Sequence, residues 1–255
     1  MKKCIGTGWD IGTFWLYSKG EIMNLSDRLD LITRHSCEDI ETLPQMQAML
    51  SGTLTKDQYI GFLMNLYPIV SNFCPTMAFA AGRCADRHDV VRRYLYDHIF
   101  EEREHEQLVL NDLRAFEVDV SGVSARVPEL PVQAMIAYNY HHVLANPVHV
   151  LGMIYVLEVL AVLYGGRVAK SVAVSMGRKV DEGFSFLDSH AQLDEDHTAK
   201  LKMLFVFLNE THNMLLLNSV EANFYLFKNI ISFNKKYPTQ NVDSEINSRE
   251  NIVFY

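Results

Sequence analysis

Apolar residues recur every three to four positions along most of the chain, which is the spacing of one face of an α-helix. Alternating apolar and polar runs are almost absent, and no Asn-Gly or Asp-Gly pair marks a hairpin turn. The pattern therefore predicts an all-α protein. The expected helices cover residues 26–34, 39–50, 55–83, 89–116, 131–145, 147–177, 182–208 and 211–235.

The two ends of the chain lack this periodicity. Residues 1–22 are predicted to form an irregular N-terminal preamble, and residues 237–255 an extended or mobile tail. Residues 23–236 contain no polar stretch long enough for a linker, so we expect one helical domain there. Met23 precedes Ser26, a suitable helix N-cap, and one hypothesis therefore places the natural start of the protein at Met23.

The most apolar stretch is "VLGMIYVLEVLAVLYGG", which carries Glu158 at its centre. It is too short for a comfortable transmembrane span, so we interpret it as a buried core helix and expect no membrane association. The net charge of −8 and the lack of a basic run argue against nucleic-acid binding. Four cysteines without a CxxC pair favour reduced thiols and a cytoplasmic protein.

Two histidines and an aspartate share one face of the expected 182–208 helix. At about 100° per residue, His190, Asp194 and His197 point within a sector of roughly 60°. Apolar residues flank that sector, so it is expected to face inward, where buried imidazoles and a carboxylate need ligation or hydrogen bonds. A metal ion meets that need; an exposed polar helix with chance spacing is the alternative.

Two further segments supply carboxylates. Glu102 and His105, in "HIFEEREHEQLVLNDL", stand three residues apart, as in the ExxH elements of carboxylate-bridged metal pairs. Charged helices often contain this spacing, so a solvated face remains an alternative. Glu158 has no polar helix face around it and needs a cation, an arginine or a proton. Together the three segments offer three carboxylates and three imidazoles, a set that suits two Fe(II) ions.

The ordered elements "EEREHEQLVLNDL", "PVHVLGMIYVLEVLA" and "FLDSHAQLDEDH" resemble those of the haem-oxygenase-like iron-containing redox enzymes, also called haem-oxygenase-like diiron oxidases. The resemblance implies a haem-oxygenase-like bundle of about seven core helices, two Fe(II) per chain and dioxygen as co-substrate. Glu101 is a substitute for Glu102, and Asp112 a partner that orients an imidazole. The implied ligands are Glu102, His105, Glu158, His190, Asp194 and His197.

The resemblance implies dioxygen as the oxidant but leaves the substrate open. It implies oxidative decarboxylation, carbon–carbon cleavage, desaturation or N-oxygenation of a small amino-acid-derived or fatty-acyl metabolite in natural-product biosynthesis. An external electron donor is one expected partner. A homodimer is the expected oligomer only because homodimers are the commonest oligomers. The substrate pocket is expected between the 55–83 helix, the 131–145 helix and the ligand helices. Its candidate polar lining is Tyr67, Tyr138, His141 and His142.

Three other interpretations stay open at this point. A haem oxygenase would need a proximal histidine on an early helix, for which His35 is the nearest candidate, but this leaves Glu158 unexplained. A thiaminase-like enzyme would need a cysteine nucleophile, and Cys74 lies in an apolar helix typical of core. A non-redox helical protein of the same fold that binds a ligand or acts in regulation is the third.

Overall fold

The computed structural model describes residues 17–18 and 21–232, which are almost entirely helical. Side chains of residues 192–195 lie outside the described part, although their backbone continues a helix. A two-residue hairpin precedes the helices, with β1 Tyr17–Ser18 antiparallel to β2 Glu21–Ile22. The helices are α2 Leu25–Glu41, α3 Pro44–Ser51, α4 Lys56–Arg83, α5 Asp89–Glu102, α6 Glu106–Ala115, α7 Leu130–Ala145, α8 Val150–Leu160, α9 Gly166–Ser175, α10 Ser185–Phe205 and α11 Glu210–Ser232.

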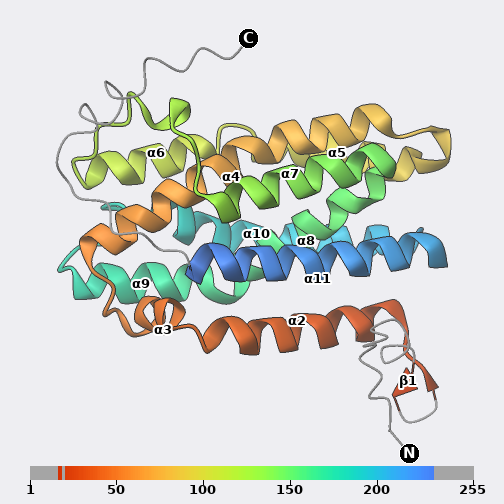
Figure 1. Ribbon diagram of the computed structural model, residues 1–255, viewed down its shortest axis with the longest axis horizontal. Coiled ribbons are helices and arrows are strands. Elements are labelled where there is room, and N and C mark those ends of the chain that lie inside the picture. The colour runs from red at the N-terminus through yellow and green to blue at the C-terminus, as the bar shows by residue number, and fades with distance from the viewer. Residues whose placement is uncertain (1–16, 19–20, 233–255) are drawn as a thin grey trace, which may run out of the picture.

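The helices form a bundle around α8, as the sequence predicted for an all-α chain (Figure 1). α11 packs along α8 and α2, and α4 packs against α5, α6 and α7. α10 contacts α8, α9 and η4, the π-helical segment Ala161–Gly165 that joins α8 to α9. Three short 3-10 segments complete the described part: η1 Asp86–His88, η2 Val123–Ala125 and η3 Pro147–His149. α8, the most apolar helix, therefore lies against α4, α7, α10 and α11.

The first two helices differ from the prediction. α2 begins at Leu25, where the side chain of Asn24, rather than Ser26, accepts a hydrogen bond from the backbone N–H of Asp27. The predicted 26–34 helix continues to Glu41 because Cys37 and Ile40 prolong its buried stripe through a polar stretch. The predicted 39–50 helix is correspondingly shortened to α3.

The predicted 89–116 helix is in fact two helices. α5 ends at Glu102, Arg103 is extended, and Glu104 has a left-handed φ of 70°. α6 then begins at Glu106, directly after His105. Neither glycine nor proline marks this break in the sequence, so the local pattern gives no warning of it.

The predicted buried core helix is α8. Among the described residues, one helical stretch, Pro147–Ser175, is long and apolar enough to cross a membrane, but 78% of its most apolar window is buried inside the bundle. Glu158 lies in α8 and is itself buried. The predicted preamble falls mostly, and the predicted tail wholly, outside the described residues, so this domain division stays a prediction.

Candidate metal centre

Imidazoles and carboxylates from four segments of the bundle converge at one buried place. α5 supplies His98 and Glu102 near its end, and the turn before α6 supplies His105. α8 supplies Glu158. α10 supplies His190 and His197, which lie seven residues apart and so project from nearly the same side of the helix.

One group of four side chains gathers around the two glutamates. The ligand atoms of His98, Glu102, Glu158 and His197 all lie within 4.8 Å of one another, and all four residues are buried. His98 Nε2 is 3.0 Å from Glu158 Oε1. His197 Nδ1 is 3.3 Å from Glu102 Oε1 and 3.3 Å from Glu158 Oε2. Two imidazoles and two carboxylates thus point at a common centre.

A second group shares Glu102 with the first. Glu102 Oε2 lies 2.9 Å from His105 Nδ1 and 3.8 Å from His190 Nε2, and the two imidazole nitrogens are 3.0 Å apart. The other oxygen of Glu102 faces the first group. A carboxylate that gives one oxygen to each of two adjacent donor sets has the arrangement of a bridging ligand in a metal pair.

Both glutamates are ionised in this environment. Burial alone would raise the pKa of Glu102, but the hydrogen bonds and charges of His105 and His190 outweigh it and hold that pKa well below its usual range. Burial likewise opposes ionisation of Glu158, and its contacts with His197 and His98 lower its pKa. The site therefore presents carboxylates, the form that binds metal ions.

Several nitrogen and oxygen atoms of the cluster that could bind a metal ion make no hydrogen bond. In the described part of the chain, Glu102 Oε1, Glu158 Oε2 and His98 Nε2 are fully buried, and none has a partner with hydrogen-bond geometry. The 3.0 Å approach of His98 Nε2 to Glu158 is a close contact without that geometry. Buried polar atoms without partners are costly, and a cation among them removes the cost, so this donor set fits a metal ion.

Asp112 holds the start of the histidine-bearing helix rather than an imidazole. Its carboxylate accepts hydrogen bonds from the backbone N–H groups of Ser185 and Phe186, both at 2.9 Å, and from the Ser185 hydroxyl. The Phe186 carbonyl oxygen lies 2.8 Å from His190 Nδ1. The described contacts of Asp112 are with the start of α10, so its predicted role of orienting an imidazole would act on His190 through the backbone of α10.

Glu101 lies on the outer side of the cluster. Its carboxylate is 3.3 Å from His197 Nε2, the nitrogen that faces away from Glu102, and 2.7 Å from Lys200 Nζ. A carboxylate behind a ligating histidine fixes the orientation of the ring and raises its basicity. The structure thus gives the central position to Glu102, and Glu101 does not take the substitute role that the sequence left open.

Five of the six predicted ligands come together here: Glu102, His105, Glu158, His190 and His197. Asp194 lies in α10, but its side chain is outside the described part, so its ligand role stays a prediction. His98 was missed. The sequence does carry a signal for it, because His98 stands four residues before Glu102 and such pairs share a helix face.

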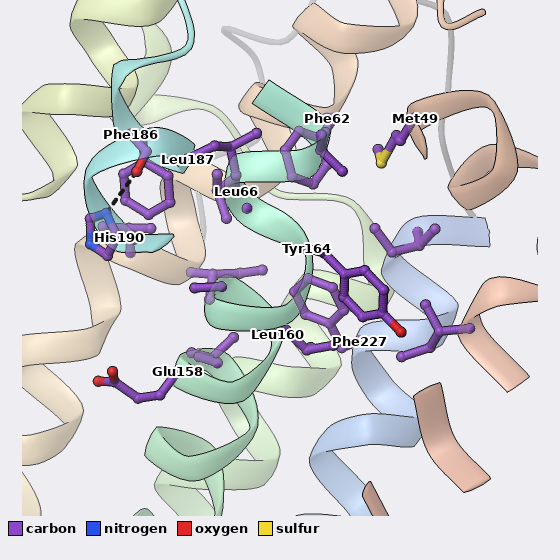
Figure 2. A pocket seen from close by; sticks show the side chains of 18 of the residues that line it. Met49, Phe62, Leu66, Glu158, Leu160, Tyr164, Phe186, Leu187, His190 and Phe227 are labelled. Carbon is purple, nitrogen blue, oxygen red and sulfur yellow. Dashed lines mark hydrogen bonds between the residues drawn. The ribbon is translucent and has the colours of Figure 1, made fainter. Parts of the chain in front are cut away.

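An apolar cavity of about 110 Å³ begins at Glu102, Glu158 and His190. Figure 2 shows the hydrogen bond from His190 to the Phe186 carbonyl at this end, and Met49, Tyr164 and Phe227 on the opposite side. The cavity is enclosed by residues of α2, α3, α4, η4 and the helices after it, together with α5 and α8. It adjoins the candidate metal centre directly.

The predicted polar lining does not belong to this cavity. Tyr67 of α4 does not line it, although its neighbours Leu66 and Val70 do. Tyr138, His141 and His142 lie on α7, which packs against α4, α11 and η3 and contributes no lining residue. The ring of His142 instead contacts that of His149 in η3, with ring centroids 4.8 Å apart and the rings tilted by 40°.

The other candidate residues have unsuitable positions. His35 is exposed on α2 and does not line the cavity. Burial, with Glu102 and Glu106 nearby, raises the pKa of the Cys74 thiol to about 11, which disfavours a thiolate nucleophile.

Comparison with known proteins identifies the family. The model of a family described as iron-containing redox enzymes matches residues 60–217. No curated protein sequence matches the chain.

Solved structures share the fold. A domain of unknown function with a heme oxygenase-like fold from Shewanella denitrificans OS217 is 21% identical, with a TM-score of 0.74 over 83% of this chain and 91% of that one. A TenA homologue from Pseudomonas syringae pv. tomato is 15% identical, with a TM-score of 0.70 over 81% and 91%. A heme oxygenase from Leptospira interrogans is 18% identical, with a TM-score of 0.66 over 82% and 99%. The predicted haem-oxygenase-like bundle is confirmed.

Proposed function

The chain belongs to the family of iron-containing redox enzymes, and from that premise we propose that it is a dioxygen-dependent non-haem oxidase or oxygenase with two Fe(II) ions per chain. One observation carries the proposal: Glu102 directs one carboxylate oxygen to each of two buried donor groups. Two imidazole-rich sets joined by one carboxylate suit a pair of redox metals better than a single structural ion.

Each iron has its own donors. His98, Glu158 and His197 would hold one ion, and His105 and His190 the other, with Glu102 between them. Asp194 is the proposed further ligand, as the sequence pattern implies. Two Fe(II) ions bring four positive charges against three carboxylates, so the loaded cluster would be nearly neutral. Bound iron would supply one-electron chemistry and the reduction of dioxygen, which side chains cannot perform.

The surrounding residues support this chemistry by orientation and by exclusion of water. Glu101 and the Phe186 carbonyl fix the rings of His197 and His190. The apolar cavity keeps bulk water from the inner side of the cluster. On the outer side, a surface depression of about 480 Å³ is lined by His98, Glu101 and Lys200 together with exposed Phe100 and Met203, and this side is our proposed approach for an external electron donor.

Iron binding and oxygen consumption test the proposal. Anaerobic titration of the metal-free chain with Fe(II) should end at about two ions per chain, and a pulse of dioxygen should then be consumed. His197→Ala and Asp194→Ala should abolish that consumption while the helical circular dichroism spectrum stays nearly unchanged. If the protein binds no iron and consumes no dioxygen, the proposal is wrong, and the alternative of a ligand carrier with the same fold is favoured.

A further inference from the structure

Two histidines outside the candidate metal centre meet where α5 and α11 begin. His88 ends η1 directly before α5, and His212 lies in the first turn of α11. Their Nε2 atoms are 3.3 Å apart, although the two residues are 124 positions apart in the chain. His88 is buried and His212 is partly exposed. The fold therefore brings two imidazole nitrogens together at a place that solvent can reach.

The distance between these two nitrogens suits a shared metal ion. N–H···O hydrogen bonds in proteins usually span about 2.9–3.0 Å, so the 3.3 Å between His88 and His212 is a long contact. Two nitrogens that bind one tetrahedral zinc ion lie about 3.3 Å apart, because each Zn–N bond is about 2.05 Å long. The pair can form a long hydrogen bond when both rings are neutral, but its spacing is that of two zinc ligands.

The orientation of the two rings agrees with this spacing. Their centroids are 5.1 Å apart and their planes are inclined by 62°. Two imidazoles that point at one tetrahedral zinc ion would have centroids about 5.2 Å apart. Rings that point straight at each other across the same nitrogen distance would have centroids about 5.6 Å apart, as in a linear hydrogen bond. The shorter observed separation means that both rings are inclined to the line between their nitrogens, as convergence on one ion requires.

Both imidazoles are in the protonation state that binds metal ions. Burial lowers the pKa of His88 and of His212, and the positive charge of Arg87 lowers the pKa of both further. Each ring is therefore neutral at pH 7 and can offer Nε2 as a ligand. Arg87 is exposed, so solvent and salt screen its repulsion of a bound cation.

This pair is separate from the candidate iron cluster. His98 follows His88 by ten residues, which is about 15 Å along α5. Neither His88 nor His212 lines the cavity beside the cluster. An ion at the pair would therefore act on the opposite end of α5 from Glu102.

We infer that His88 and His212 together bind a zinc ion, which joins the start of α5 to the first turn of α11. Imidazole nitrogen is a common ligand of zinc, and water would complete the coordination on the partly exposed side of His212. Two protein ligands hold an ion less firmly than the four of a structural zinc site, so occupancy would follow the concentration of free zinc. The inference does not rest on the proposed function, because it uses no residue of the cluster.

Counting bound zinc ions tests the inference. Wild type, His212→Gln and His141→Gln are dialysed against increasing Zn(II), and the zinc bound per chain is measured. Zinc that enters the iron cluster is common to all three proteins, so the difference between them reports on the pair. Wild type and His141→Gln should bind one more zinc ion than His212→Gln. Equal zinc in all three proteins would overturn the inference.

These variants distinguish a metal ligand from a structural contact. Glutamine can still form a hydrogen bond with His88 Nε2, but its amide is a poor zinc ligand. His141 is exposed on α7, so His141→Gln controls for the loss of any one histidine. Zn(II) at about a hundred times the dissociation constant of the additional ion should raise the melting temperature of wild type by about 5 °C more than that of His212→Gln. An equal increase in both would mean that the pair forms only a hydrogen bond.

Diffraction tests the position of the ion without any variant, and so decides the matter even if His212→Gln does not fold. Crystals of wild type soaked in Zn(II) should show an anomalous peak at the zinc edge, about 2.05 Å from the Nε2 atoms of both His88 and His212. Zinc peaks at the cluster without one between these two rings would contradict the inference.

Discussion

Two histidine-containing regions of the described chain differ in chemistry: one brings imidazoles against carboxylates, and the other brings them against each other. In the cluster of α5, α8 and α10, imidazoles touch ionised carboxylates at 2.9–3.3 Å. In the region of α7 and η3, the rings of His142 and His149 contact each other at a tilt of 40°, and the described contacts of these rings are to tyrosine and histidine. The same residue type therefore serves two purposes.

The difference lies in charge. Burial, with His142 beside it, lowers the pKa of His149 to about 4, so this imidazole is neutral and behaves as core. Glu102 and Glu158 instead remain ionised although they are buried. Histidine burial alone is thus poor grounds for a metal site, and a shared carboxylate is the distinguishing feature.

The largest effect is expected for the shared carboxylate. Glu102→Gln replaces one carboxylate oxygen by an amide nitrogen and leaves the other oxygen uncharged, so both irons should be lost, measured as Fe(II) bound per chain after anaerobic titration. The decrease in affinity should exceed the roughly 10–100-fold that loss of an outer partner causes. Glu104→Gln, two residues along and exposed, is the control. Retention of one tightly bound iron in Glu102→Gln would show that the two groups do not depend on one bridge.

Removal of one histidine from each region should have a smaller effect on iron binding. His98→Ala should weaken one iron by about 100-fold and leave the other in place, because His98 belongs to only one donor group. His142→Ala should leave both affinities unchanged. Competition with a chromophoric chelator measures each. Equal losses in the two variants would contradict the distinction between the regions.

Substitution of Glu101, the outer carboxylate, should lower iron affinity less than either change above. Glu101→Gln keeps the shape of the side chain but weakens its hold on His197 Nε2 and on Lys200. We expect about a tenfold loss of iron affinity. Lys200→Met, which leaves Glu101 charged, should have a smaller effect. A larger loss in Lys200→Met than in Glu101→Gln would mean that the lysine, and not the carboxylate, supports the site.

The smallest effect concerns the neutral histidines. Because the pKa of His149 is lowered to about 4, the unfolded chain binds a proton below its own pKa of roughly 6.5 that the folded chain does not. Stability should therefore be complete above pH 6.5, fall by about 1 kcal/mol at pH 5.5 and stop falling from this cause near pH 4. Urea unfolding of His149→Gln should show a flatter pH slope than wild type, with exposed His141→Gln as control.

Much of the cluster follows from helical geometry. His190 and His197 could be placed on one face because α10 is continuous through both. Glu158 stood out because its helix is apolar all round. Glu102 and His105 were paired correctly but for the wrong reason, since a left-handed turn at Glu104 and not a continuous helix brings them together. Residues only three positions apart stay close in space even where the helix between them is interrupted.

The remainder depends on packing between helices. His98 shares a helix face with Glu102, but its contacts with Glu158 and His197 arise only where α8 and α10 approach α5. Tyr138, His141 and His142 were placed in the pocket because they are polar residues on an apolar helix, but α7 faces other partners. Asp112 was predicted to orient an imidazole, and nothing in the sequence indicated that it would do so by binding Ser185 and the backbone at the start of α10.

The central claim is that the carboxylate-linked cluster, and not the α7–η3 histidines, holds a pair of irons. Anomalous diffraction at the iron absorption edge, on crystals loaded anaerobically with Fe(II), tests it directly. We expect two iron peaks on either side of Glu102, one among His98, Glu158 and His197 and the other between His105 and His190. A single peak, or a peak between His142 and His149, would contradict the account.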